Sequence, residues 1–128
     1  NMIFTESHIV AADETAATMG SGLLAVYATP AVVALMEHTA CLLIAAIPAD
    51  QPGALTEGNT TVGTRMAIDH LKACLPGSEV LSTAELLNMD GRQYEFHIEV
   101  KDASGNLLAK AEHTRFMVAA ERFMQKLQ

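Results

Sequence analysis

The residue with the clearest potential for chemistry is Glu37, a carboxylate in the middle of the apolar segment from Val32 to Ala40. Burying a lone carboxylate costs free energy, so such a group needs charged or hydrogen-bonding partners. Two interpretations follow. Glu37 either points outward on the one wet stripe of a helix, beside His38, or it acts as a general base or nucleophile in a cleft.

Thr29 and His70 are the two residues that could join Glu37. Thr29 lies eight residues before Glu37 and precedes Pro30, so it is suited to cap the start of a helix. In one regular helix, Thr29 and Glu37 would lie roughly 12 Å apart and could not share a proton. As a cap, however, Thr29 could point its hydroxyl elsewhere, and nearby helix-start N–H groups could stabilise an oxyanion. His70 ends a predicted strand and becomes relevant only if that end faces Glu37 or Thr29.

Arg115 is a weaker candidate, in the segment 112–116 of the last predicted strand. By itself it would be a solvated residue, but near a cleft it could pair with a phosphate or a carboxylate. The remaining histidines lack the spacing of metal ligands, so no metal site is predicted. Because the chain has neither a Gly-x-Ser-x-Gly elbow nor a Gly-rich phosphate loop, we expect no serine-hydrolase mechanism.

A long helix and several antiparallel strands must position these residues. Residues 30–47 are apolar almost throughout and Pro48 follows them, which predicts a helix that the rest of the chain wraps on nearly every side. Asp90-Gly91 indicates a hairpin, and residues 93–100 alternate between apolar and polar side chains. Strands are predicted over 7–12, 59–71, 78–89, 93–100 and 107–118, with short helical segments over 13–19 and 119–127. The pattern predicts an α+β fold, an antiparallel sheet wrapped around one long central helix.

Composition narrows the class of protein. The 128 residues predict one domain spanning 1–128, and half of them are hydrophobic. The formal charge of −7 and the scattered Lys and Arg residues argue against a nucleic-acid surface. No apolar stretch is long enough for a membrane span, and no basic segment precedes an apolar run as in a signal peptide. Cys41 and Cys74 are expected to be reduced, packed thiols, so we predict a cytoplasmic protein.

Four short motifs resemble those of the fluoroacetyl-CoA thioesterase-like family. Residues 28–37 (ATPAVVALME) resemble the start of that family's central helix. Residues 62–70 (VGTRMAIDH) resemble its next strand, with Gly63 and His70 seven residues apart. The Pro76-Gly77 turn and residues 113–115 fall in the expected order. The resemblance runs from about residue 5 to residue 123, nearly the whole chain.

This resemblance implies a fold, an activity and a set of site residues. The family has the hot-dog fold, usually as a homodimer with active sites at the subunit interface, and it hydrolyses acyl-CoA thioesters. The family's catalytic Thr, Glu and His fall on Thr29, Glu37 and His70, and its ligand-contacting Gly and Arg fall on Gly63 and Arg115. Coenzyme A would enter as part of the substrate, and no cofactor is expected. The implied partners are an acyl-CoA and a second copy of the chain, with no nucleic acid and no membrane.

One difference between this sequence and the family it resembles bears on the substrate. Specialised members carry aromatic residues before the helix, whereas residues 19–27 contain only Tyr27, which favours a short- or medium-chain acyl-CoA. Either His70 is the base with Glu37 orienting it, or Glu37 is itself the base or nucleophile, and either water or Thr29 attacks. Two rival functions remain: a non-catalytic acyl-CoA-binding hot-dog protein, and a hot-dog enoyl-CoA hydratase or dehydratase, whose Asp–His helix motif is not seen here.

Overall fold

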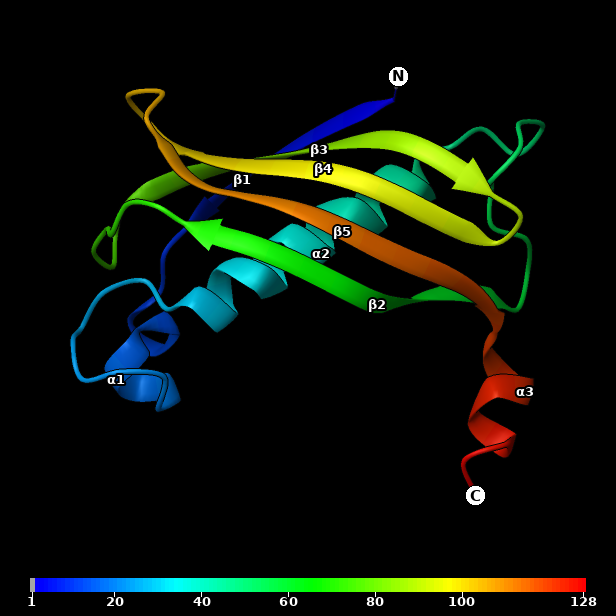
Figure 1. The fold of residues 1–128 in the computed structure, drawn as a ribbon, viewed down its shortest axis with the longest axis horizontal. Helices are drawn as coiled ribbons and strands as arrows, with labels where there is room; N and C mark the ends of the chain where they lie inside the picture. The colour runs from blue at the N-terminus through cyan, green and yellow to red at the C-terminus, as the bar shows by residue number, and fades with distance from the viewer. Residues whose placement is uncertain (1) are drawn as a thin grey trace.

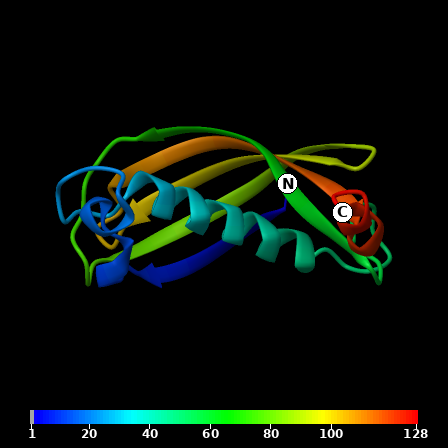
Figure 2. The same cartoon turned by 90° about the horizontal axis from the view of Figure 1, so that it is seen from below.

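The architecture is one antiparallel sheet with a long helix across one of its faces (Figures 1 and 2). The computed structural model describes residues 2–128; Asn1, which the predicted domain includes, lies outside them. The five strands are ordered β1-β3-β4-β5-β2, which confirms the predicted α+β arrangement. The elements are β1 (Ile3–Ile9), η1 (Ala12–Glu14), α1 (Ala16–Met19), α2 (Thr29–Ala45), β2 (Asn59–His70), β3 (Glu79–Asp90), β4 (Gln93–Asp102), β5 (Leu107–Ala119) and α3 (Ala120–Gln125).

The start of α2 differs from the expected cap. Ala28 is the N-cap and has no side-chain hydrogen bond to the helix, whereas Thr29 is the first helical residue and Pro30 follows it. The prediction that Thr29 caps the helix was therefore wrong. Its hydroxyl is instead hydrogen-bonded to His70, a residue far away in the sequence. The fixed φ of Pro30 suits the first helical turn without a cap.

The core lies between α2 and the inner face of the sheet. The alternation predicted for β4 is confirmed: Tyr94, Phe96, Ile98 and Val100 are each at most 1% exposed. Opposite them, α2 contributes fully buried side chains such as Met36. Burying each such side chain contributes roughly 1.5–3 kcal/mol, so this seam of contacts fixes where α2 sits on the sheet.

The expectation that α2 is buried on nearly every side was wrong. Pro30, Ala34 and His38 are exposed and Glu37 is half-buried, so one stripe of the helix is open. Figure 2 shows the reason, because the sheet covers only one side of α2 and no second layer from residues 2–128 lies on the other side. The open stripe therefore carries apolar residues together with Glu37.

The first strand was also misplaced. It was expected over residues 7–12 but runs from Ile3 to Ile9. Its register is set by β3, with Ile3 opposite Glu85 and Ile9 opposite Glu79. Because β1 is an edge strand with mixed polar and apolar side chains, pairing with its neighbour decides its position more than its own pattern does.

Candidate active site

Two of the predicted site residues meet where α2 begins and β2 ends. The Thr29 hydroxyl lies 2.8 Å from Nδ1 of His70. The other ring nitrogen of His70, Nε2, is buried and has no hydrogen-bond partner within residues 2–128. A hydroxyl and an imidazole at this distance can pass a proton between them, which is the arrangement that general-base activation of a nucleophile needs.

A hollow of about 230 Å³ surrounds this pair. Its lining includes Tyr27, a residue that the sequence pattern did not mark as part of a site. Tyr27 is 1% exposed, its hydroxyl has no partner within the described residues, and burial raises the pKa of Tyr27 well above its usual value. The phenol therefore stays protonated and can donate a hydrogen bond. In sequence, an aromatic residue in an apolar run cannot be told apart from an ordinary core residue.

Glu37 belongs to a second group of polar residues, farther along α2. Its Oε2 atom accepts a hydrogen bond from Nη1 of Arg115 at 3.2 Å. The Glu37 side chain is 41% exposed and that of Arg115 is 8% exposed, so the ion pair stands at the border between core and surface. The interpretation that Glu37 points toward the open stripe of the helix holds in part, since the residue lies there but also has a buried cationic partner; a role as base or nucleophile stays a prediction.

Gly63 allows this close approach. A Cβ atom at this position would collide with Oε2 of Glu37 and would lie 3.2 Å from Nη1 of Arg115. Gly63 is also opposite Arg115 in the β2–β5 ladder, immediately before a shift of register between Gly63 and Arg65. The missing side chain and the bulge together bring the backbone of β2 against the Glu37 carboxylate.

Arg115 makes three contacts to two other residues besides Glu37, namely Thr61 and His113. Its Nε donates to Oγ1 of Thr61 at 2.9 Å, its Nη2 donates to the Thr61 carbonyl at 3.1 Å, and its Nη1 lies 3.2 Å from Nε2 of His113. Nδ1 of His113 lies 2.7 Å from the carbonyl of Arg65, so the neutral ring donates from Nδ1 and accepts at Nε2. Burial, and then the nearby Arg115, hold the pKa of His113 below its usual value. Arg115 is therefore committed to protein partners and fixes the position of the Glu37 carboxylate.

Thr61 and His113 were not predicted as site residues. Thr61 and Gly63 are two residues apart on β2, and His113 and Arg115 are two residues apart on β5. Side chains two residues apart on a strand share a face, so this spacing is the only signal of their common location. That signal has meaning only when the pairing of the two strands is known.

The five predicted residues thus form two separate groups within one chain. Thr29 and Glu37 lie roughly 12 Å apart along α2, and Gly63 and His70 lie roughly 23 Å apart along β2. No hydrogen bond within residues 2–128 joins Glu37 to Thr29 or His70. A single thioester carbonyl therefore cannot contact both groups of one protomer.

Neither a metal site nor a membrane span is found in the described part of the chain. No group of three His, Cys, Asp or Glu side chains in residues 2–128 is arranged to hold a metal ion. In the same range, every helix is too short or too polar to cross a membrane. Cys41 and Cys74 are half-buried and form no disulfide within the described residues.

Comparison with known proteins gives consistent matches. The family model described as fluoroacetyl-CoA-specific thioesterase (FlK) matches residues 10–121. The fluoroacetyl-CoA thioesterase of Streptantibioticus cattleyicolor is 33% identical over 102 residues, which cover 80% of this chain and 68% of that protein. A solved structure of FlK superposes with a TM-score of 0.87 at 25% identity, covering 98% of this chain and 91% of the other.

More distant structures share the fold. A thioesterase-superfamily protein from Thermus thermophilus has a TM-score of 0.83 at 21% identity, with 98% of this chain and 87% of that chain covered. A hot-dog-like protein from Thermanaerovibrio acidaminovorans has a TM-score of 0.80 at 19% identity, with the same coverage of 98% and 87%. The hot-dog fold expected from the sequence is therefore confirmed.

Proposed function

This chain belongs to the family of fluoroacetyl-CoA-specific thioesterases, and on that premise we propose that it hydrolyses short- or medium-chain acyl-CoA to the free acid and CoA. The observation that carries the proposal is the pairing of Thr29 with His70 at 2.8 Å beside a hollow. Glu37, held by Arg115, supplies a carboxylate on the same open side of α2. These are the groups that thioester hydrolysis requires: a hydroxyl, a base and a fixed negative charge.

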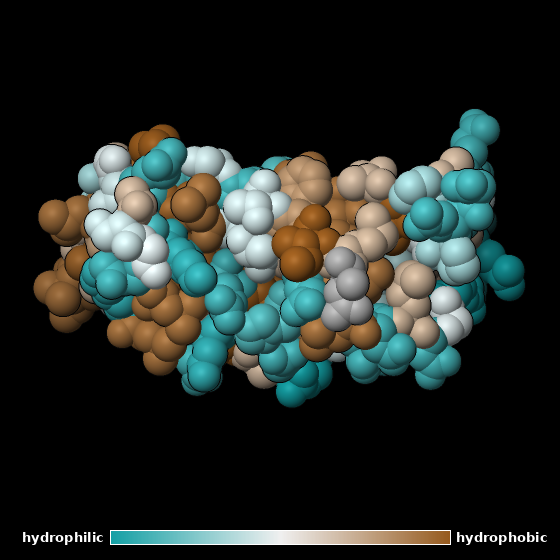
Figure 3. Space-filling view, turned by 90° about the horizontal axis from the view of Figure 1, so that it is seen from above, coloured by the Kyte–Doolittle hydropathy of each residue, from teal (hydrophilic) through white to brown (hydrophobic). Residues whose placement is uncertain are grey.

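The surroundings of Thr29 and His70 support an acyl group larger than fluoroacetyl. Leu23 is 95% exposed and Leu24 is 69% exposed, in the loop that precedes α2. Leu71, which lines the hollow, is 56% exposed. Figure 3 shows apolar surface at the end of the molecule where α1 lies. Exposed aliphatic side chains next to a site favour an alkyl chain, whose burial contributes about 0.8 kcal/mol per CH₂.

A panel of acyl-CoAs tests this assignment. We expect release of free CoA, followed with a thiol reagent, and a kcat/KM that rises from acetyl-CoA to butyryl- and hexanoyl-CoA. Each added CH₂ buried against the leucines should raise kcat/KM by roughly three- to four-fold, until the hollow is filled. Fluoroacetyl-CoA serves as the matched comparison for acetyl-CoA. A strong preference for fluoroacetyl-CoA over every longer chain would contradict the proposal.

We further propose that two copies of the chain complete each site. β2 is an edge strand of twelve residues, and long unpaired edges are normally covered. If two β2 strands pair antiparallel about a two-fold axis near Met66 and Ala67, His70 of one protomer lies opposite Gly63 of its partner. Thr29 and His70 of one copy would then face Glu37 of the other, and the open stripe of α2 would be covered.

The chemistry follows from this arrangement. His70 removes the proton from the nucleophile, which is the Thr29 hydroxyl or a water that this hydroxyl orients. Attack makes the thioester carbonyl oxygen negative, and N–H groups at the start of α2 can stabilise that charge. The C–S bond then breaks and His70 returns the proton to the CoA thiolate. The Glu37 carboxylate stabilises the protonated imidazole during these steps. If Thr29 attacks, water hydrolyses the acyl-threonine in a second, equivalent cycle.

Mixing two inactive variants tests the shared site. One variant carries Thr29→Ala and His70→Ala, and the other carries Glu37→Gln. When the two are unfolded and refolded together in equal amounts, half of the dimers are mixed, and each mixed dimer holds one complete site. We therefore expect about a quarter of the wild-type activity to return, although each variant by itself is nearly inactive.

The control for this experiment mixes Glu37→Gln with the double variant Glu37→Gln/His70→Ala. No dimer in that mixture holds an intact carboxylate, so it should stay inactive. Native mass spectrometry confirms that mixed dimers form. If they form and no activity returns in the first mixture, Glu37 and His70 do not act across the interface.

A further inference from the structure

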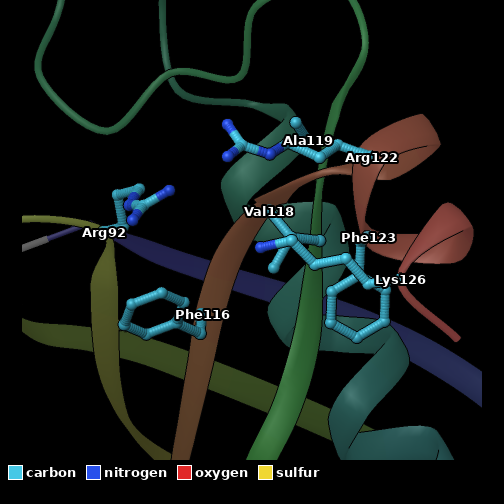
Figure 4. Close-up of a pocket in the computed structure, with 7 residues that line it drawn as sticks. All are labelled: Arg92, Phe116, Val118, Ala119, Arg122, Phe123 and Lys126. Atoms are coloured by element: carbon cyan, nitrogen blue, oxygen red, sulfur yellow. The ribbon is translucent and has the colours of Figure 1, made fainter.

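A second hollow, of about 310 Å³, lies at the end of the sheet near the C-terminus. Its walls come from three parts of the chain: the β3–β4 turn, the end of β5, and α3 with the residue that follows it (Figure 4). Neighbouring residues on a strand face opposite sides, so Phe116 lies on the other face of the sheet from the buried Arg115. The side chains that line the hollow include Arg92, Phe116, Val118, Arg122, Phe123 and Lys126.

This hollow is basic in a strongly acidic protein. The chain has eight Lys and Arg residues and a formal charge of −7, and three of the eight line this one hollow. Within residues 2–128, none of Arg92, Arg122 and Lys126 forms an ion pair with a carboxylate. Arg122 and Lys126 are four residues apart and repel each other, and Figure 4 shows both extending over β5 toward Arg92. A bound anion would relieve this repulsion.

Aromatic rings accompany the charges. The guanidinium of Arg92 lies 5.5 Å from the ring centre of Phe116, a distance typical of a cation–π contact. Phe123 is 36% exposed, a large fraction for a phenylalanine ring beside a hollow. Arg and Lys bind phosphates, and aromatic and guanidinium faces stack on nucleobases. The combination fits a ligand that has both phosphate groups and a planar base.

The hollow is close to the catalytic carboxylate. Phe116 is opposite Val62 in the β2–β5 ladder, next to the pair formed by Gly63 and Arg115. From Arg115 to Val118 the strand advances by roughly 10 Å, a span that the pantetheine arm of CoA can cover.

We propose that this hollow binds the phosphorylated adenosine end of the CoA substrate, with Arg92, Arg122 and Lys126 on its phosphates and a phenylalanine ring against the adenine. The inference rests on the proposed acyl-CoA thioesterase function and extends it. In this proposal Arg115 does not contact the phosphates, because its guanidinium is held by Thr61, His113 and Glu37.

The test uses Arg122→Ala/Lys126→Ala, because both residues are exposed, Arg122 on the peripheral helix α3 and Lys126 directly after it. We expect the Kd for adenosine 3′,5′-bisphosphate, measured by calorimetry, to rise at least about ten-fold, as the loss of two charge-assisted hydrogen bonds implies. The KM for butyryl-CoA should rise by a similar factor with kcat unchanged. Hydrolysis of butyryl-N-acetylcysteamine, which lacks the nucleotide, should not change. The control Lys101→Ala/Lys110→Ala removes the same charge elsewhere and should leave all three values unchanged.

The outcomes separate this inference from the proposed function. Unchanged binding of adenosine 3′,5′-bisphosphate in Arg122→Ala/Lys126→Ala overturns the inference, whatever the thioesterase activity. Equal losses in the control double variant overturn it too, because the effect would then come from net charge alone. If inorganic pyrophosphate binds as tightly as the nucleotide, the adenine contact is wrong. If the wild-type protein binds the nucleotide but hydrolyses no thioester, the proposed function fails while the hollow is supported.

Discussion

Replacing Glu37 with Gln is expected to lower kcat by on the order of 10²-fold or more while the protein stays folded. The amide has the size of the carboxylate, and its oxygen can still accept the hydrogen bond from Arg115 that is 3.2 Å long in the wild type. Arg115 also keeps its two contacts to Thr61. What the variant loses is the negative charge that stabilises a protonated imidazole. The measurement is kcat with butyryl-CoA and a thiol reagent, together with the thermal unfolding midpoint.

Glu57→Gln is the matched control for this variant. Glu57 is an exposed carboxylate in the segment before β2, so its substitution changes the net charge equally but leaves the site intact. It should retain the wild-type kcat and unfolding midpoint. A wild-type kcat in Glu37→Gln would show that this carboxylate has no part in the reaction.

Replacing His70 with Ala is the second change with a large expected effect, again a fall in kcat of on the order of 10²-fold or more. The Thr29 hydroxyl would lose the acceptor that now lies 2.8 Å away, and with it the only side-chain partner that it has within residues 2–128 for removal of a proton. The cost in stability should be small, because His70 is the last residue of β2 and is only half-buried. Steady-state kinetics and circular dichroism measure the two effects separately.

Two further variants, a control histidine and a change at Thr29, are needed to interpret the kcat of His70→Ala. His38→Ala removes an exposed histidine that is hydrogen-bonded to Glu6 on the other side of α2, and it should leave kcat unchanged. Thr29→Val keeps the shape of the side chain and removes its hydroxyl. A loss as large as that of His70→Ala identifies Thr29 as the nucleophile, whereas a smaller loss identifies a water that Thr29 orients. Wild-type turnover in His70→Ala would exclude His70 as the base.

Much of the scaffold could be predicted because its signals are local. The helix over residues 29–45 followed from a long apolar run that ends before Pro48, and the β3–β4 hairpin from Asp90-Gly91. The inward face of β4 followed from strict alternation. Each of these features depends on residues within a few positions of one another. Local propensity and periodicity are therefore sufficient for them.

The site was harder to predict, because its contacts join residues that are far apart in the sequence. Gly63 was named because short motifs resemble a known family, and the same resemblance grouped His70 and Arg115 with Glu37. The contacts of these residues could not be derived from spacing. The contact between Thr29 and His70 joins residues 41 apart in sequence, and that between Glu37 and Arg115 joins residues 78 apart. Distances of this kind follow only from the order of the strands and the position of α2 across them.

The sequence pattern by itself determined one long apolar helix, an antiparallel sheet and several candidate polar residues, whose grouping into one predicted site came from the family resemblance. Only the tertiary structure decided that Glu37 pairs with Arg115 against Gly63, while Thr29 pairs with His70 at the far end of β2. It also decided that α2 is covered on one side only. The physical reason is that burial of an apolar side chain is not directional, so its residue type does not indicate which segment covers it. Whether another strand, another helix or a second copy of the chain covers α2 depends on how far five strands can curl around it.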